Sequence, residues 1–377
     1  AATAASTVGE LQTVTERAAA AAAAAAAVES AADLLKRVDA QYVETLRPLA
    51  YEQVDMENAA HTAFEHYYKA NIADCPADAI AKSKIQRLMR ELRKLSGGGG
   101  EGALPIAAEA AIFARVDESR TDVLKVLISG PADLHDRSRE TPYALGLFEF
   151  HIFVPNDYPQ VPPLVNLQTT GDGMVRFNPN LYSDGKVCLS LLGTWHGEGW
   201  TPPSGSNMGS TLLQVLVSIQ SIIMVSKPYF NEPGYADEEG TPAGEQRSRE
   251  YNEHIRLAAM RHAMRDMLRR PPRGFEEVVR RHFVLNRPLL ERQCAAWLGE
   301  CVAPQNRVAM EKAYVEIVEL IEVAEKKLAA GEGSEGGEGV GADSGSSGST
   351  LDAPTTVAAA AAPNEVTMAE AQQATPV

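Results

Sequence analysis

The stretch from residue 177 to residue 203 constrains this chain most, because it surrounds one cysteine with residues that restrict the backbone. Pro179 fixes its own φ and favours extended backbone at the residue before it, and the Asp-Gly pair at 184–185 is typical of a tight turn. Asn180 and Cys188 lie on either side of that turn. These restraints predict that Asn180 is held at a fixed distance from Cys188, in a loop that presents a reactive thiol.

The same stretch resembles the active-site signature of the ubiquitin-conjugating enzymes. In that family a Phe-His-Pro-Asn run leads through an Asn/Asp-Gly turn to Cys-Leu and then to Trp-Ser-Pro, and the spacing here matches through Cys188. Asn178 stands where the family usually has a histidine that is mainly structural. An extra segment, 196–199, separates Trp195 from Trp200. The resemblance implies a conjugating enzyme whose loop packing differs from the usual pattern.

Within that family the chain is most similar to the conjugating domain of the giant BIR-containing enzymes, over residues 80–300. In those relatives the domain also works without a separate ligase, which leaves a hybrid conjugating enzyme and ligase role open here. The similarity rests on residues 130–133, 176–182, 185–190, 194–197 and 228–235.

The resemblance implies that ubiquitin, or a ubiquitin-like protein, passes from an ATP-dependent activating enzyme to Cys188 and then to a substrate lysine or a ubiquitin ligase. A thioester suits this transfer because thiolate leaves more easily than alkoxide. A free thiol has a pKa of ~8.5, so a modest thiolate fraction suffices without a neighbouring histidine base. No cofactor is implied.

Two more residues take catalytic roles by resemblance. Negative charge develops on the carbonyl oxygen when a lysine attacks the thioester, and Asn180 is the candidate donor that stabilises it. Glu232 stands at a position similar to the family's acidic gate residue, which orients the lysine, with Asn231 and Asp237 as alternatives. The sequence equally allows Asn180 to be a loop-fixing residue that hydrogen-bonds the backbone.

Other residues of the stretch are expected to support the loop or to bind partners. Asn178 and Pro179 shape it, and Trp195 and Trp200 are expected to wall the site. By resemblance, Trp200 and Pro202 lie near the surface that meets ligases.

The Tyr-Pro-x-x-Pro-Pro run at 158–163 also matches the family. Its prolines predict a stiff loop that presents Val161 to a partner at low entropy cost, although such a run is also typical of a strand-ending turn.

Residues 81–95 predict an amphipathic helix with an apolar stripe and basic residues on its other faces. It resembles the first helix of the conjugating fold, where Lys84, Arg87 and Arg90 would meet the activating enzyme. A solvated face on a core-packed helix explains the same pattern. A later group of arginines leaves a similar choice between an acidic partner and solvent: Arg261, Arg265, Arg269, Arg270, Arg273, Arg280 and Arg281.

Periodicity predicts an α+β fold, similar to the ubiquitin-conjugating fold, with a four-stranded antiparallel meander, an N-terminal helix, a crossing helix and extra C-terminal helices. The strands are expected at 112–116, 123–129, 147–154 and 164–167. The later helices are expected at 211–225, 249–268, 275–283 and 305–328.

Composition divides the chain into a central domain with flanks. Alanine dominates the first segment, and glycine, serine and acidic residues dominate the last, which predicts mobile ends. The segments are an Ala-rich extension (1–27), a helical flank (28–79), the conjugating core (80–285, with a glycine linker at 96–102 and a loop insertion at 134–140), a C-terminal helical extension (286–330) and a disordered acidic tail (331–377).

The net charge, the cysteine count and the alanine run limit the kinds of partner and compartment that we expect for this protein. A net charge of −15 argues against a dedicated nucleic-acid binder, because phosphate contacts need a basic surface. Four cysteines are too few for a disulfide framework in this chain, so we expect a reducing compartment, the cytoplasm or the nucleus. The ten alanines at 18–27 are shorter than the ~20 apolar residues of a membrane span, so we expect no membrane segment. Because the chain begins with Ala1, we expect a fragment or a processed product.

Three other functions fit parts of the sequence. A metal site would use His282, Cys294 and Cys301, but their spacing lacks the usual ligand pattern, and no metal is expected. A cysteine hydrolase would need a histidine such as His196 close to Cys188. A non-catalytic ubiquitin-binding scaffold of the same fold would not need the cysteine, so thioester formation distinguishes it.

Overall fold

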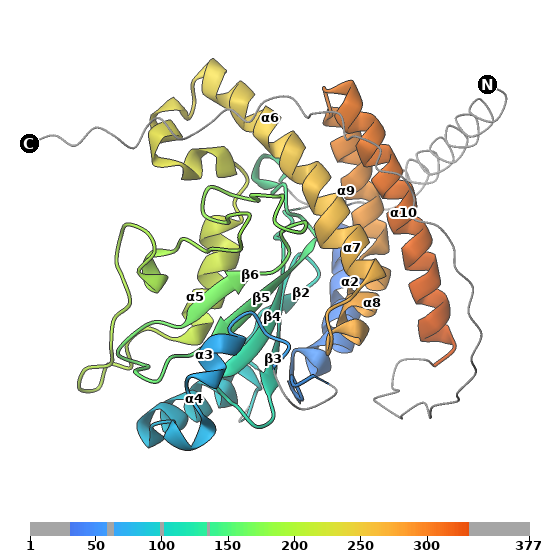
Figure 1. The fold of residues 1–377 in the computed structure, drawn as a ribbon. Helices are drawn as coiled ribbons and strands as arrows, with labels where there is room; N and C mark the ends of the chain where they lie inside the picture. Colours follow the sequence, from blue (N-terminus) through green and yellow to red (C-terminus); the bar gives the residue numbers. More distant parts are fainter. Residues whose placement is uncertain (1–30, 59–63, 99–101, 134–135, 332–377) are drawn as a thin grey trace, which may run out of the picture. The chain divides into compact units, whose positions relative to one another are not determined.

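The centre of the fold is an antiparallel sheet whose main strands follow one another along the chain (Figure 1). The structure, a computed structural model, describes residues 31–58, 64–98, 102–133 and 136–331. Val126 pairs with Ala114 on one side and with Phe150 on the other. The predicted α+β fold with a four-stranded meander is therefore confirmed. The four strands are β3 (Ala110–Asp117), β4 (Val123–Ser129), β5 (Leu147–Phe153) and β6 (Leu164–Leu167).

Two short strands that the sequence did not predict extend the sheet beyond β3. β1 (Tyr51–Val54) lies parallel to β3, and β2 (Ile106–Ala107) lies antiparallel to it. β1 falls inside the flank expected to be only helical, which is a correction. Arg115 stabilises this junction, because its guanidinium donates to the carbonyl oxygens of Leu49 (3.0 Å) and Gly274 (2.6 Å).

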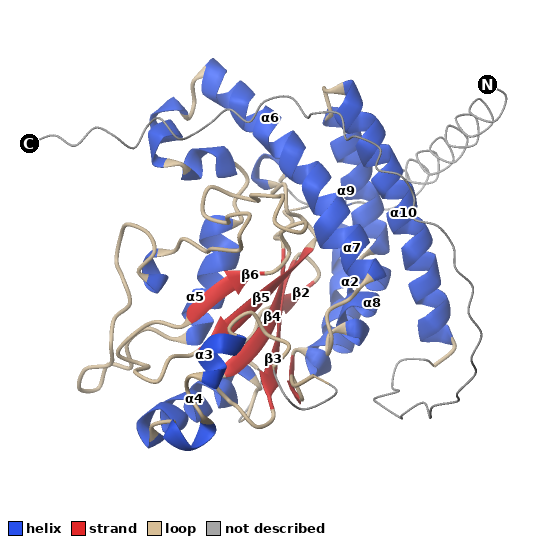
Figure 2. Ribbon diagram, in the orientation of Figure 1, coloured by secondary structure: helices blue, strands red, loops and turns tan. Residues whose placement is uncertain are grey.

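Helices cover both sides of the sheet (Figure 2). All seven residues of β4 are buried, so neither face of that strand meets solvent. This differs from an ordinary antiparallel sheet, which commonly leaves one face solvated. The N-terminal flank and the C-terminal helices therefore pack as parts of one core with the sheet.

Within the described residues, the α-helices before the meander are α2 (Ala31–Leu46), α3 (Lys69–Ala73) and α4 (Lys82–Leu95). The apolar stripe of α2 is buried at Leu35, Val38, Tyr42 and Leu46, and it packs mainly against the C-terminal helix α8. Ile72 of α3 joins a smaller cluster with Val123 and Phe153 of the sheet.

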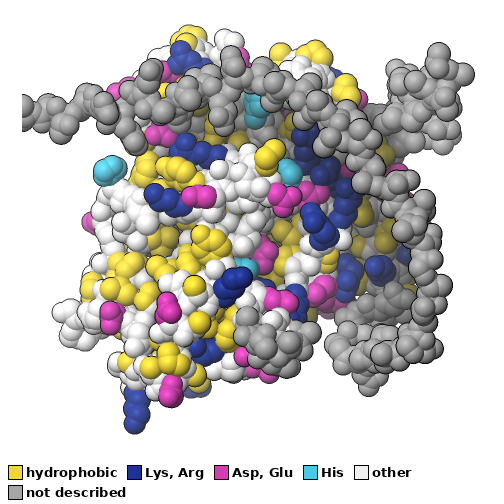
Figure 3. Space-filling model, viewed as in Figure 1, with side chains coloured by type: hydrophobic (Ala, Val, Ile, Leu, Met, Phe, Trp, Pro, Cys, Tyr) yellow, Lys and Arg dark blue, Asp and Glu magenta, His cyan; other side chains and the backbone are white. Residues whose placement is uncertain are grey.

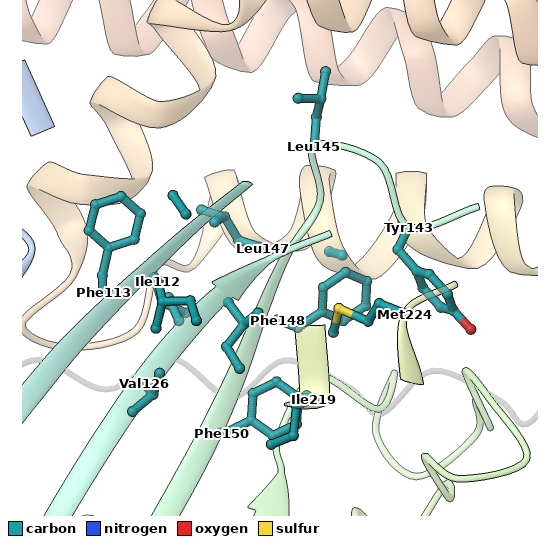
Figure 4. Packing of buried hydrophobic residues seen from close by; sticks show 14 of the residues in the cluster. Ile112, Phe113, Val126, Tyr143, Leu145, Leu147, Phe148, Phe150, Ile219 and Met224 are labelled. Carbon is teal, nitrogen blue, oxygen red and sulfur yellow. The ribbon is translucent and has the colours of Figure 1, made fainter. Parts of the chain in front are cut away.

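The crossing helix α5 (Leu212–Ser218) begins with a capping box between Thr211 and Gln214, and continues into a π-helical turn, Ile219–Ile223. Ile219 and Met224 pack against Phe148 and Phe150 of β5 (Figure 4). Ile222 of the same segment lies outside this core, because its side chain is 60% exposed.

The C-terminal helices pack against α2 and the sheet. The sequence predicted all of them except α9, whose Trp297 is completely buried. Their bounds are α6 (Pro242–Ala258), a π-helical segment (Ala259–Arg265), α7 (Asp266–Arg269), α8 (Glu276–Leu285), α9 (Arg287–Glu300) and α10 (Pro304–Ala329).

Short 3-10 helices occupy Arg47–Leu49, Ala77–Ala79, Arg137–Arg139, Ser190–Leu192, Pro228–Asn231 and Pro233–Glu238. Several predictions lie outside the described residues: the extension at 1–27, part of the glycine linker (99–101), part of the loop insertion (134–135) and the tail after residue 331.

Most of the arginines that follow the core meet carboxylates of the same chain. Arg265 and Arg269 pair with Glu316, and Arg281 pairs with Glu277. On the face seen in Figure 3, positive and negative side chains alternate over the C-terminal helices. These pairs favour the interpretation of a surface neutralised within the chain. Among the described helices, none is both long enough and apolar enough to cross a membrane.

Candidate active site

Cys188 lies on one arm of a tight β-hairpin. The Cys188 amide donates to the Asn180 carbonyl oxygen at 2.9 Å, and the Tyr182 amide donates to the Lys186 carbonyl oxygen at 3.0 Å. Gly185 adopts a φ of 85° at the turn, which glycine tolerates and other residues rarely adopt. The restraint that the sequence predicts between Asn180 and Cys188 is therefore present.

Asn180 contacts the cysteine through the main chain. Its side-chain Nδ2 donates to the Cys188 carbonyl oxygen at 2.9 Å, and its side chain is buried. In this structure the amide donor fixes the loop, which is the second of the two roles that the sequence left open. A role at a developing oxyanion stays a prediction.

Asn178 lies at the centre of a buried hydrogen-bond network that supports the hairpin. Its Nδ2 donates to the Tyr143 hydroxyl (2.9 Å) and to the Ile223 carbonyl oxygen (2.8 Å), while its Oδ1 accepts from the Asn180 amide (2.9 Å). The side chain of Asn231 also donates to that Oδ1, at 3.3 Å. Asn231 therefore has a structural contact in this network, and its role as an alternative gate residue stays a prediction.

Sequence reasoning missed Tyr143 and Thr194. The Tyr143 hydroxyl donates to the Phe177 carbonyl oxygen at 2.8 Å from a completely buried position. The Thr194 hydroxyl accepts from the Leu189 amide (3.0 Å) and donates to the Val187 carbonyl oxygen (2.8 Å). It therefore fixes the residues on both sides of Cys188. The only available signal for Thr194 was its position six residues after the cysteine, next to Trp195.

The thiol of Cys188 is nearly covered, since the residue is 2% exposed. Burial raises its pKa, while the charge of Lys186, hydrogen bonding to the Tyr182 hydroxyl and the charge of Arg176 oppose that rise. Among the described residues, the groups that act on the pKa of this thiol include no histidine, and His196 is exposed beside the ring of Trp195. This arrangement differs from the cysteine–histidine pair that a cysteine hydrolase needs.

Arg176 connects the hairpin to the predicted gate residue. Its guanidinium lies 4.2 Å from the ring centroid of Tyr182, and its Nη2 donates to the Pro179 carbonyl oxygen at 2.6 Å. The same atom lies 3.5 Å from Oε2 of Glu232. Glu232 therefore lies at the margin of the site, one side chain away from Tyr182, and is paired with an arginine that the sequence analysis did not single out for this role.

The two tryptophans have different surroundings. Trp200 donates from Nε1 to the Pro159 carbonyl oxygen at 2.8 Å and packs against Tyr158. Trp195 is half-buried beside His196. Trp200 therefore anchors the segment 196–203 to the loop at 158–163, called the proline loop below.

The predicted partner-binding residues of α4 need correction. Lys84 is completely buried and pairs with Asp122 at 2.6 Å, and Arg87 is buried between Glu91 and the Ser210 carbonyl oxygen (2.9 Å). Their charges are neutralised inside the fold, and Lys84 is not presented to a partner, whereas Arg87 reaches the wall of a neighbouring groove. Arg90 is exposed, as predicted.

A groove of about 820 Å³ lies between the start of α4, the proline loop and residues 203–208. Arg90 and Val161 both line it. Pro202 is exposed immediately before the residues that form the third wall. The structure thus brings together three of the residues predicted to bind partners.

The proposed metal ligands have other partners. The Tyr42 hydroxyl donates to Nδ1 of His282 (2.7 Å), whose Nε2 donates to the Leu145 carbonyl oxygen (3.0 Å). Burial lowers the pKa of His282 to about 4, although the hydrogen bond to the Leu145 carbonyl oxygen opposes that shift. His282 is therefore a core residue that joins α2, α8 and the loop before β5.

Known proteins that are similar to this chain support the resemblance to the ubiquitin-conjugating enzymes found in its sequence. Residues 105–259 match the family profile described as "Ubiquitin-conjugating enzyme". The chain is 44% identical over 275 residues to the mouse protein named "Dual E2 ubiquitin-conjugating enzyme/E3 ubiquitin-protein ligase BIRC6", a match that covers 71% of this chain and 5% of that protein; the human protein of the same name gives the same figures. It is 46% identical over 223 residues to "Probable ubiquitin-conjugating enzyme protein 17" of Caenorhabditis elegans, which covers 59% of this chain and 29% of the relative. The chain therefore spans a small part of each of these relatives.

Proposed function

This chain belongs to the ubiquitin-conjugating enzyme family, and we propose that it carries ubiquitin as a thioester on Cys188 and transfers it to an amine. The observation that carries the proposal is the hairpin that holds Asn180 against Cys188 inside the matched region. A cysteine with restrained neighbours and no histidine base suits acyl transfer from one thioester to another, because that exchange needs only a modest thiolate fraction.

In the first step the Cys188 thiolate attacks the thioester between an activating enzyme and the C-terminus of ubiquitin. A new carbon–sulfur bond forms at Cys188, and the thiolate of the activating enzyme leaves. Lys186 and Arg176 favour the attacking thiolate through their positive charges. Because Cys188 is nearly covered, the incoming C-terminus displaces side chains beside the thiol, such as Tyr182, which hydrogen-bonds to it.

In the second step a substrate amine attacks the thioester carbonyl, and the Cys188 thiolate leaves. We propose that Asn180 then shifts its Nδ2 from the Cys188 carbonyl oxygen toward the negative oxygen of the intermediate. Glu232 leaves Arg176 and orients the incoming unprotonated amine, whose nitrogen loses a proton to solvent as the carbon–nitrogen bond forms and the carbon–sulfur bond breaks. The 3.5 Å separation in this pair supports the exchange, because a partly exposed pair of this length contributes little to stability.

The proposed partners are an activating enzyme, a protein substrate and, where one is used, a ligase. The groove lined by Arg90 and Val161 offers them a surface with charged and apolar contacts. Half-buried Met208 contributes to the apolar part. The relatives named as dual enzymes support a second option, transfer without a separate ligase. We place the reaction in the cytoplasm or the nucleus.

A charging assay tests the function. The chain is incubated with activating enzyme, ATP and ubiquitin or one of several ubiquitin-like proteins, and the products are separated with and without thiol reductant. We expect a reductant-sensitive adduct with one modifier. Cys188→Ser should give an adduct that resists reductant but is cleaved by hydroxide, because it is an oxygen ester. Absence of any adduct across the panel would favour a non-catalytic scaffold.

Omission of the ligase tests the dual role. Transfer to a substrate that proceeds at the same rate without a ligase supports it, and strict dependence on an added ligase contradicts it.

A further inference from the structure

Arg176 places a positive charge between the Cys188 hairpin and Glu232. Its guanidinium carbon lies 4.2 Å from the centroid of the Tyr182 ring, and its Nη2 donates to the Pro179 carbonyl oxygen at 2.6 Å. The same nitrogen lies 3.5 Å from Oε2 of Glu232. Tyr182 also hydrogen-bonds to the Cys188 thiol, and the charge of Arg176 acts on that thiol. One cation therefore lies beside both the reactive residue and the proposed gate carboxylate.

A substrate lysine fits the same two contacts. Its amine has an ordinary pKa of ~10.4, so at neutral pH it arrives as a cation, which a carboxylate and the face of an aromatic ring both stabilise. Glu232 and the ring of Tyr182 provide these groups beside Cys188, but Arg176 already contacts both. The arginine thus lies where the proposed mechanism places the acceptor.

The contact between Arg176 and Glu232 is weak. Nε of Arg176 is buried and has no hydrogen-bond partner within the described residues, and a donor in that state disfavours the conformation that buries it. The two side chains are 32% and 28% exposed, and a partly exposed pair at 3.5 Å adds little stability. Arg287 differs, since it donates to Glu291 at 2.9 Å and to Glu325 at 3.0 Å. An acceptor can therefore displace Arg176 from Glu232 without breaking a strong ion pair.

The two classes of acceptor need opposite charges from this pair. A ligase cysteine attacks as a thiolate, which the positive charge of Arg176 attracts and the negative charge of Glu232 repels. A lysine has the opposite preference, because Arg176 repels it until it loses its proton. The position of one arginine therefore changes which acceptor is favoured.

We propose that Arg176 is a specificity-determining residue that occupies the acceptor position of the thioester-bearing enzyme, so that a lysine must displace it whereas a thiolate reacts with it in place. This inference rests on the proposed function. In both reactions the acceptor attacks the thioester carbonyl and the Cys188 thiolate leaves. The lysine loses one proton to solvent before the attack and a second as the carbon–nitrogen bond forms. The thiolate forms a carbon–sulfur bond and loses no proton.

Discharge to two small acceptors tests the proposal. The chain is charged with ubiquitin, the activating enzyme is quenched, and single-turnover rate constants are measured with free lysine and, separately, with 2-mercaptoethanol, a thiol without an amine. Arg176→Gln should raise the ratio of the lysine rate to the thiol rate at least fivefold. Arg247→Gln is the matched control and should keep the parent ratio, because Arg247 pairs with Glu238 in the segment that follows Glu232.

The gain should depend on Glu232. In a Glu232→Gln chain, Arg176→Gln has no carboxylate to release, so it should leave the ratio of that chain unchanged. A ratio that rises equally in both backgrounds contradicts a role through Glu232. Arg176→Met, which keeps an unbranched side chain over the Tyr182 ring, is the second variant in case loss of the hydrogen bond to Pro179 prevents charging of Arg176→Gln.

Two further results overturn the inference. One is an unchanged ratio in a charged Arg176 variant, because the arginine then only fixes the loop. The other is loss of charging in both Arg176 variants, because that result assigns Arg176 to the first step of the reaction. A parent chain that forms no thioester is a different result, since it removes the proposed function and this inference with it.

Discussion

The side chain of Asn180 donates its hydrogen bond to the carbonyl oxygen of Cys188, at 2.9 Å, and so joins the two arms of the hairpin at the reactive residue. The same amide group is the one that the sequence predicts as a hydrogen-bond donor to the negative oxygen that forms when a lysine attacks the thioester. One side chain therefore serves the resting loop and, in the proposed mechanism, the transfer step. The two roles differ in their energetic cost and can be separated by experiment.

Asn180→Ala should slow transfer to an amine much more than it slows charging. Loss of one hydrogen bond costs about 1 kcal/mol of stability, whereas loss of an oxyanion donor slows a reaction by about 10²-fold. Charging and single-turnover transfer to free lysine would be measured separately, with melting temperature as the control for folding. Equal losses in both steps would assign Asn180 to the loop alone.

Tyr143→Phe should destabilise the fold without a direct effect on the thiol. The hydroxyl donates to the Phe177 carbonyl oxygen and accepts from Asn178, so its removal leaves buried polar groups without a partner. Such a loss costs about 1–3 kcal/mol. Urea unfolding would measure it, and Tyr67→Phe is a matched control because Tyr67 is 53% exposed. Equal stability of the two variants would contradict the role of the network.

Lys84→Ala should lower the stability of the fold, whereas Arg90→Ala should weaken charging. Removal of Lys84 leaves Asp122 buried with one cationic partner fewer, which costs about 3–5 kcal/mol when a buried pair is broken. Arg90 is exposed at the groove, so its removal should weaken charging by the activating enzyme and leave the melting temperature unchanged. A stable Lys84→Ala chain with weak charging would restore the original prediction for Lys84.

These residues show where sequence reasoning succeeds and where it stops. The hairpin could be predicted because its causes are local: Pro179, the turn at Asp184 and the glycine after it. The burial of Lys84 and Arg87 could not, because their partners Asp122 and Ser210 lie 38 and 123 residues away. A helical pattern separates apolar from basic faces, but it does not identify which basic side chain meets a distant acceptor.

The same distance effect explains the missed elements. β1 has only four residues, and its pairing with β3 spans more than fifty positions of the chain. α9 contributes Gln293, whose side chain donates to Glu140 at 2.6 Å, so the end of the loop insertion and a late helix support each other. Neither partner alone carries a periodic signal for that contact.

Alkylation of Cys188 should occur at higher pH than alkylation of an ordinary thiol. Burial raises its pKa, and the Tyr182 hydroxyl and the charges of Lys186 and Arg176 limit that rise. Tyr182→Phe and Arg176→Gln should therefore each move the midpoint of the pH–rate profile further upward. Mass spectrometry resolves Cys188 from the other cysteines, and the urea-unfolded chain is the reference. A midpoint below that of the unfolded chain would contradict the assigned balance of burial and charge.

Stability should fall as the pH drops below about 6.5, the ordinary pKa of histidine. The side chains of His66 and His151 are buried and stacked, with ring centroids 4.5 Å apart, and His66 donates from Nε2 to the Leu124 carbonyl oxygen at 2.9 Å. Burial, with the charge of His151 as a second cause, lowers the pKa of His66 to about 3. Below pH 6.5 the unfolded chain therefore binds a proton that the folded chain resists, and the free energy of unfolding decreases until the pH reaches about 3.

The difference between the two pKa values corresponds to several kcal/mol, on the order of 1.4 kcal/mol for each pH unit in that interval. Urea unfolding at intervals between pH 7 and pH 4 would measure the slope. His66→Gln should make the slope shallower even though it lowers stability at pH 7, whereas His196→Gln, at an exposed position, should keep the parent slope. His282 contributes in the same direction from its own buried site, so His66→Gln should leave part of the slope in place. A slope unchanged in His66→Gln would show that the stacked pair does not set the acid limit of this fold.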